Sequence, residues 1–153
     1  MKIKLTPELS YLAGVTKYSR IKKGIGVRGP QQLQEAFVKG ALDAGIASAD
    51  KFIVKDAGLL FFHSAYEAYL GRVQEEAVDK FKHLNDYAAA YLAGLFDSVG
   101  GIADGSVYLY KFDRQDEAIL DNLGFESKVS AGRVYIGHHE QFLRFIKKWA
   151  KIE

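Results

Sequence analysis

The second half of the chain contains two kinds of segment. In short segments apolar and polar residues alternate, and in longer segments between them apolar residues recur at helical spacing. A period of two predicts strands, and a period near 3.6 predicts amphipathic helices. The expected strands cover 99–103, 106–112, 125–129 and 133–137, and the expected helices cover 86–96, 114–122 and 139–151. Asp104-Gly105 and Ala131-Gly132 are typical hairpin turns between neighbouring strands. The predicted order is therefore α-β-β-α-β-β-α.

The first half of the chain repeats this order. The expected helices cover 7–16, 30–44 and 64–82, and the expected strands cover 18–22, 25–28, 51–55 and 59–62. Short identities connect the two halves: Leu12-Ala13-Gly14 matches Leu92-Ala93-Gly94, and Ala57-Gly58 matches Ala131-Gly132. We therefore expect an α+β protein of two pseudo-symmetric α-β-β-α-β-β-α repeats, residues 1–82 and 83–153, each with a four-stranded antiparallel sheet.

Small residues recur at equivalent places on the first helix of each repeat. Ser10 and Gly14 are four residues apart on one helical face, and Ala90 and Gly94 are their counterparts. A glycine inside a helix costs about 1 kcal/mol relative to alanine, but it lets a second backbone come close. The alternative is that each glycine relieves crowding within its own half. We predict that the two repeats pack through these paired helices, with Ser10, Ala13, Gly14, Ala90, Ala93 and Gly94 at the interface.

Composition narrows the class of protein. No apolar run approaches the length of a membrane span, and the first residues lack the apolar stretch of a signal peptide. The absence of cysteine excludes disulfides and thiolate metal sites. The scarcity of asparagine and methionine is typical of a thermophile. We expect a cytoplasmic protein without a membrane partner, monomeric because its symmetry is internal.

The segment Leu92-Ala93-Gly94-Leu95-Phe96-Asp97-Ser98-Val99-Gly100 resembles the LAGLIDADG motif of a homing endonuclease family. The duplicated element order resembles that family's repeat, so the resemblance covers nearly the whole chain. It implies motif helices packed at the centre and a four-stranded sheet in each half, the two forming a saddle on duplex nucleic acid. It also implies a divalent metal bound by an acid from the eighth position of each motif.

The chain departs from the family at this eighth position, which is Val99 in the second half and Ser19 in the first. Valine cannot ligate Mg²⁺, and a lone serine hydroxyl is a poor replacement for a carboxylate. Metal-assisted phosphodiester cleavage needs such oxygens to hold the ion and activate water. Asp97, at the sixth position, is the nearest acid, but its counterpart is Lys17. We therefore predict no catalytic residue, no metal, no cofactor and no enzymatic activity.

Two further sequence patterns are only weak indications of a binding site. The segment Gly24-Ile25-Gly26-Val27-Arg28-Gly29 matches GxGxxG, but the residues before it are basic rather than an apolar parallel strand. These glycines can still let backbone N–H groups near Pro30 approach a phosphate. His138-His139-Glu140 lacks a third ligand at suitable spacing, so capping or surface roles are expected.

Basic and aromatic residues on the expected strands are the candidates for binding. The first half carries a run of five cations, from Lys17 to Arg28, with no acid among them. Such residues can contact phosphates, although a solvated strand face is the alternative. Alternation places Tyr108 and Tyr110 on one strand face, where their rings could stack on bases. The candidate nucleic-acid-binding residues are Lys17, Arg20, Lys22, Lys23, Arg28, Tyr108, Tyr110, Lys111, Lys128 and Arg133.

The favoured function is that of a catalytically inactive LAGLIDADG-type protein that binds nucleic acid. The lack of an appended helix-turn-helix and the net charge of only +2 favour structured RNA in a ribonucleoprotein, for example a ribosome-associated one. One alternative is a DNA-binding protein or a divergent metal-dependent DNA endonuclease that uses Asp97 or Asp104. The other is a protein-interaction subunit that binds no nucleic acid.

Overall fold

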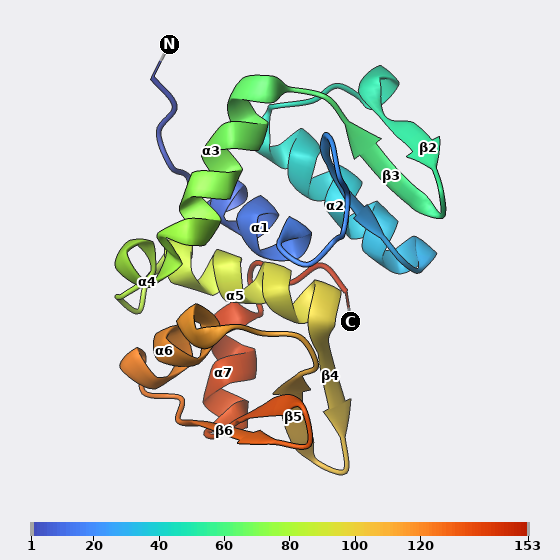
Figure 1. Ribbon diagram of the computed structural model, residues 1–153. Helices are drawn as coiled ribbons and strands as arrows, with labels where there is room; N and C mark the ends of the chain where they lie inside the picture. The colour runs from blue at the N-terminus through green and yellow to red at the C-terminus, as the bar shows by residue number, and fades with distance from the viewer. Residues whose placement is uncertain (1, 153) are drawn as a thin grey trace.

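A computed structural model describes residues 2–152 of the chain. Two helices, α1 (Pro7–Thr16) and α5 (Asp86–Val99), lie side by side at the centre, with one sheet and its helices on either side (Figure 1). The first half continues with β1 (Ile25–Arg28), α2 (Gln31–Ala44), the 3-10 turn η1 (Ala49–Lys51), β2 (Ile53–Lys55), β3 (Gly58–Phe61), α3 (Ser64–Glu75) and α4 (Ala77–Lys80). The second half continues with β4 (Gly100–Ala103), β5 (Ser106–Leu109), α6 (Arg114–Asn122), β6 (Ser127–Ser130), β7 (Arg133–Ile136) and α7 (His139–Ile146).

The two sheets share one topology. The first has the strand order β1-β3-β2, the second has the order β4-β5-β7-β6, and all neighbours are antiparallel. Without β4, the second order becomes β5-β7-β6, which matches the first strand for strand. The α+β class and the two pseudo-symmetric repeats are therefore confirmed. The expected fourth strand of the first sheet is wrong, because the described first sheet has three strands.

The segment 17–24 forms a loop where a strand was expected over 18–22. Arg20 has φ of 61° and Gly24 has φ of 92°, both outside the extended region that a strand requires. The left-handed conformation of Arg20 interrupts the alternation in the middle of the expected strand. The loop instead passes over Leu60, which points away from the helices yet is only 6 % exposed.

The helices α1 and α5 pack backbone to backbone. A methyl group at Gly14 would overlap the carbonyl oxygen of Tyr91, and one at Gly94 would overlap the carbonyl oxygen of Tyr11. Ser10, Ala13, Ala90 and Ala93 are also buried. The packing of the two repeats through their paired helices is confirmed, and both glycines lie at the closest approach.

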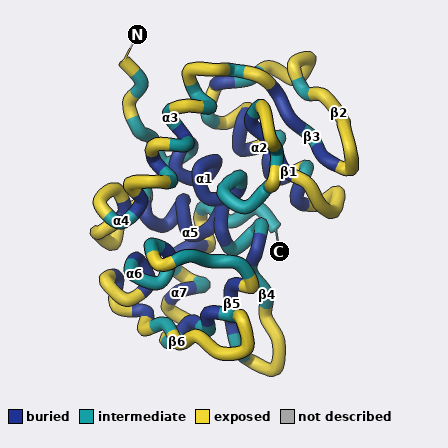
Figure 2. Tube along the Cα trace, viewed as in Figure 1, coloured by how far each residue is buried: buried dark blue, intermediate teal, exposed yellow. Residues whose placement is uncertain are grey.

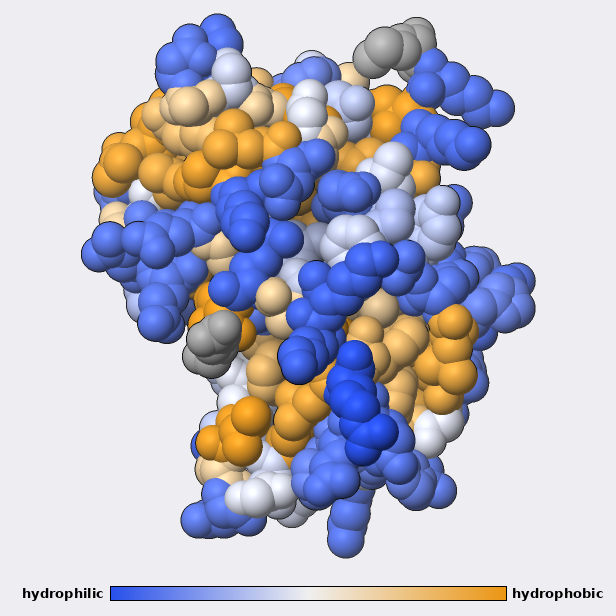
Figure 3. Space-filling model, turned by 180° about the vertical axis from the view of Figure 1, so that it is seen from behind, coloured by the Kyte–Doolittle hydropathy of each residue, from blue (hydrophilic) through white to orange (hydrophobic). Residues whose placement is uncertain are grey.

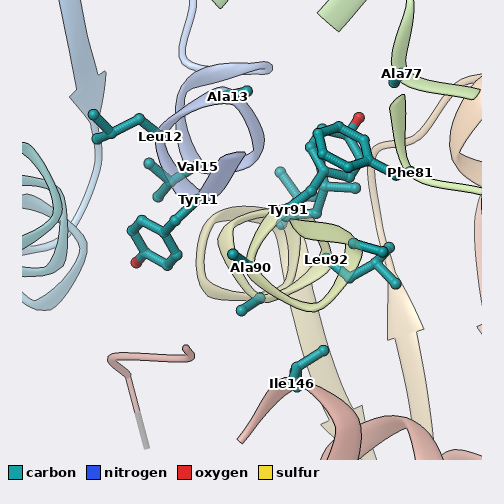
Figure 4. Packing of buried hydrophobic residues seen from close by; sticks show 14 of the residues in the cluster. Tyr11, Leu12, Ala13, Val15, Ala77, Phe81, Ala90, Tyr91, Leu92 and Ile146 are labelled. Carbon is teal, nitrogen blue, oxygen red and sulfur yellow. The ribbon is translucent and has the colours of Figure 1, made fainter. Parts of the chain in front are cut away.

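Burial is concentrated on this helix pair and on the inner faces of the two sheets (Figure 2). Tyr11 and Tyr91 occupy equivalent places and point to opposite sides of the pair (Figure 4). Tyr91 stacks on Phe81, with 4.4 Å between the ring centroids. The segment that connects the repeats is thus anchored to the central helices.

Several expected boundaries differ from the structure; for example, α5 continues to Val99 rather than ending at 96, and β5 ends at Leu109 rather than at 112. The helix expected over 64–82 is divided at Glu76, where φ is −107° and ψ is 22°. The last helix ends at Ile146 rather than at 151. The turn expected at Ala57-Gly58 lies one residue earlier, at Asp56-Ala57, and both of these residues have positive φ.

Candidate nucleic-acid interface

The outer face of the second sheet carries a row of aromatic and basic side chains. The strand register places Gly101 opposite Tyr108, Tyr108 opposite Tyr135, and Tyr135 opposite Lys128. The two tyrosine ring centroids are 5.8 Å apart. The guanidinium carbon of Arg133 lies 4.1 Å from the centroid of the Tyr108 ring. This contact keeps a cation on the outer face of the sheet.

Alternation along the strands explains this row. Val107 and Leu109 on β5, like Val134 and Ile136 on β7, are buried against the helices. The residues between them must point outward. Glycine at position 101 leaves room for the Tyr108 hydroxyl oxygen, which would lie only 2.5 Å from a Cβ atom there. The tyrosine therefore lies flat across the neighbouring strand.

The outer face of the first sheet is basic as well. A hollow of about 350 Å³ is bounded by the loop 17–24 and by β1 and β3. Four cations contribute to its wall, together with Asp56. These cations are Lys22, Lys23, Arg28 and Lys55. Phe62 also lies at this hollow and is 61 % exposed.

A second hollow, of about 260 Å³, lies between the two sheets at the ends of α1 and α5. We call it the central hollow. Its floor is apolar, because Val15, Val27 and Val99 line it and all three are buried. Its cationic wall consists of Arg20, Arg28 and Lys111. Ser19 and Tyr110 also line it, so the eighth motif positions of both repeats, Ser19 and Val99, meet here.

The central hollow does not fit a divalent cation of the kind that the fold family implies. Of the two eighth-position side chains, Val99 has no ligand atom, and the Ser19 hydroxyl oxygen accepts a hydrogen bond from the Ile21 N–H at 3.4 Å. Within residues 2–152, no group of three or more histidine, aspartate or glutamate side chains could hold a metal ion.

Asp97, the motif acid nearest to the eighth position, is held by hydrogen bonds to other parts of the chain. Its carboxylate accepts hydrogen bonds from the Tyr11 hydroxyl at 2.6 Å, the Lys151 N–H at 2.8 Å and the Ile152 N–H at 3.4 Å. Burial raises the pKa of Asp97 above its usual value, although these hydrogen bonds work in the opposite direction. The carboxylate therefore anchors the C-terminal segment to α5.

Lys17 occupies the equivalent motif position in the first repeat and is likewise held by contacts within the protein. Its ammonium lies 2.8 Å from a carboxylate oxygen of Asp113 and 3.0 Å from one of Asp116, and it donates to the Tyr91 hydroxyl at 3.1 Å. Its side chain is 8 % exposed, and that of Asp116 is fully buried. Tyr18 completes the cluster by donating its hydroxyl to Asp116 at 2.5 Å. A lysine held in this way cannot reach a nucleic acid, so we correct its expected role: Lys17 joins the two repeats.

The structure brings most of the other candidates together. Arg28 lines both hollows; Lys22 and Lys23 line the one on the first sheet, and Arg20, Tyr110 and Lys111 line the central hollow. Tyr108, Lys128 and Arg133 share the outer face of the second sheet. Sequence reasoning missed Tyr135, Lys55 and Phe62. Alternation along 133–137 could have found Tyr135, since it is two residues from Arg133.

The remaining surface offers less. A larger hollow of about 600 Å³ lies beside α7, with an apolar wall that includes Phe96, Ile102 and Leu143. Seen from behind, the molecule shows apolar areas separated by hydrophilic side chains (Figure 3). No helix among residues 2–152 is long and apolar enough to cross a membrane.

Comparison with solved structures identifies proteins with a similar fold. A structure from work on mesophilic variants of the homing endonuclease I-DmoI superimposes with a TM-score of 0.65, at 13 % identity, over 93 % of this chain and 96 % of that chain. An I-DmoI complex with DNA and manganese gives 0.60, at 12 % identity, over 96 % and 98 %. An I-DmoI variant bound to its target DNA in the presence of magnesium gives 0.62, at 12 % identity, over 92 % and 94 %. Neither protein-family models nor curated proteins match the sequence.

These comparisons confirm the resemblance to LAGLIDADG homing endonucleases at the level of the fold. The chain has the two-repeat architecture of I-DmoI over nearly its whole length. At this level of identity the likeness describes the architecture alone.

Proposed function

We propose that the protein binds double-stranded DNA across the outer faces of its two sheets and does not cleave it at the motif positions. The observation that carries this proposal is the arrangement of cations and aromatic rings on the two outer faces and around the central hollow. Cations neutralise phosphates, and exposed rings contact bases or sugars.

Duplex DNA is a better partner for this surface than structured RNA, which the sequence alone favoured. The superimposable I-DmoI structures include complexes with DNA. The B-form major groove is wide enough to admit strands, whereas the A-form major groove is too narrow for side chains to read. The aromatic row on the second sheet requires such access, because Tyr108 and Tyr135 lie in the middle of the sheet.

The lack of cleavage follows from the side chains at the centre. A two-metal or one-metal hydrolytic site needs carboxylates that converge on the phosphate. Here Val99 and Ser19 occupy the positions of the acids, and Asp97 is bound by Tyr11 and the C-terminal segment. Binding is the function that these residues leave in place.

Binding can be measured with fluorescently labelled pools of random-sequence duplex DNA and of structured RNA at several salt concentrations. We expect tighter binding to the duplex DNA, with an affinity that falls as salt rises by a slope of about 0.9 per phosphate contact on a log-log scale. The combined variant Lys128→Ala, Arg133→Ala should lower both the affinity and the slope. Lys80→Ala, Lys82→Ala removes the same charge at the end of α4 and just after it, and should change neither.

A preference for the RNA pool would restore the ribonucleoprotein hypothesis. Absence of binding to either pool would contradict the proposal and favour a protein-interaction subunit.

A divergent endonuclease is the second candidate, because superimposable I-DmoI structures contain DNA with magnesium or manganese. It would depend on an acid outside the eighth motif positions. Incubation of the protein with a DNA pool and Mg²⁺ or Mn²⁺ separates the two functions. A site-specific cut that Asp97→Asn or Asp104→Asn abolishes would establish the nuclease.

A further inference from the structure

The central hollow has a charge pattern opposite to that of a metal-binding centre. Its wall contains Arg20, Arg28 and Lys111 and no carboxylate. Four other hollows on the described surface each include one acid, namely Asp56, Glu35, Glu67 and Glu140. A surface with three cations and no counter-ion of its own favours an anion from outside the chain.

The floor of the hollow strengthens this preference. Val15 is 1 % exposed and Val27 is fully buried, so the cations lie over an apolar layer rather than over bulk water. Charge interactions are stronger next to such a layer. Both α1 and α5 end beside the hollow, and helix C-termini carry partial negative charge. Three full positive charges exceed that contribution and leave the hollow cationic.

Fixed hydroxyl groups define the remaining wall. Tyr110 donates its hydroxyl to the Ser98 carbonyl at 3.1 Å, and its N–H donates to the Val99 carbonyl at 2.8 Å. These two bonds hold the segment that carries Lys111 against the end of α5. On the other side, the Ser19 hydroxyl oxygen accepts from the Ile21 N–H, so its hydrogen can be donated to an anion. The site therefore combines guanidinium, ammonium and hydroxyl donors.

We propose that the central hollow binds a backbone phosphate of the DNA directly, without a metal ion, through Arg20, Arg28 and Lys111. This inference rests on the proposed function. Guanidinium groups bind phosphate oxygens with two parallel hydrogen bonds, which fixes the phosphate as well as neutralising it. Such a contact at the junction of the two repeats positions the duplex relative to both sheets at once.

The test compares two triple variants of the full chain on a random-sequence duplex DNA pool in the presence of EDTA. The first is Arg20→Gln, Arg28→Gln, Lys111→Gln. The matched control, Lys39→Gln, Lys82→Gln, Lys147→Gln, removes the same charge outside the interface. We expect the first variant to bind at least tenfold more weakly and its salt slope to fall by about 2 to 3, while the control stays near the wild type. The variant Arg20→Lys, Arg28→Lys should keep most of the slope, because it keeps the charge.

The outcomes separate this inference from the proposed function. Binding by the wild type with equal losses in both triple variants would overturn the phosphate site and leave DNA binding intact. Wild-type binding that disappears in EDTA would also overturn it. No wild-type binding would contradict the proposed function itself. Thermal unfolding of both triple variants shows whether a loss reflects misfolding, and in that case the slope of the Arg→Lys variant decides.

Discussion

At the scale of single residues, two features join the repeats. Glycines leave room at the contact between the central helices, and polar side chains pair across the two repeats. Gly14 and Gly94 let α1 and α5 approach until backbone touches backbone. Beside them, the Tyr11 hydroxyl donates to Asp97, and the Tyr91 hydroxyl donates to Asp116 and accepts from Lys17. The sixth motif position is thus an acid on one side, Asp97, and a cation on the other, Lys17, so the internal symmetry is only approximate.

The glycine contacts predict opposite effects of the same substitution at different sites. Gly14→Ala or Gly94→Ala should lower the free energy of unfolding by about 1–3 kcal/mol, because the new methyl group must displace the facing backbone. Gly71→Ala is the control, since nothing lies within 4 Å of a Cβ atom there. It should raise stability by about 1 kcal/mol through helix propensity. Urea unfolding measures all three, and equal effects would refute the close packing.

The cluster around Lys17 predicts a large cost for removing one charge. Lys17→Met leaves the fully buried Asp116 without its cation and should lower the free energy of unfolding by about 3–5 kcal/mol. Lys148→Met removes an exposed partner of Asp86 and should cost less than about 1 kcal/mol. Chemical denaturation compares the two variants, and similar small losses would show that Lys17 is not a structural residue.

At the scale of elements, the two repeats differ where the sequence placed charge. The second repeat forms β4 from Gly100–Ala103, while the equivalent part of the first repeat is the basic loop 17–24. This loop supplies Arg20 to the central hollow and Lys22 and Lys23 to the hollow on the first sheet. The loop that stands in place of a fourth strand thus supplies most of the cations that face the proposed interface in that half.

The three hairpin turns give a test at this scale. Each has two residues of positive φ, and the second of them is Gly105, Gly132 or Ala57. Only glycine adopts this conformation without cost. Ala57→Gly should therefore stabilise the protein by up to about 1 kcal/mol, and Gly105→Ala should destabilise it by about the same amount. Thermal unfolding at one pH measures both, and a loss of stability in Ala57→Gly would contradict the turn geometry.

Local signals predicted the elements well, and distant contacts explain what they missed. The helix 114–122 was predictable because Asp113 caps its start and Gly124 follows its end with positive φ. The duplicated Leu-Ala-Gly segments were enough to predict the paired helices. The burial of Lys17 was not predictable, because Asp113 and Asp116 lie about a hundred residues away in the sequence. A strand over 18–22 was expected because alternation alone does not reveal the left-handed conformation of Arg20.

At the scale of the whole molecule, the fold separates architecture from chemistry. The chain keeps the two-repeat architecture found in I-DmoI, with central helices and two outward-facing sheets. Where the motif would supply acids, it has Ser19 and Val99, and the surrounding wall is cationic. The proposed function therefore separates binding from cleavage, and the cationic wall supports the proposal of binding.

The most direct test of this account measures affinity for a duplex DNA pool in EDTA and again in Mg²⁺, with the DNA afterwards examined on a denaturing gel. The account predicts the same dissociation constant under both conditions, apart from the effect of ionic strength, and intact DNA strands. Binding that requires Mg²⁺, or discrete cut products in its presence, would contradict it.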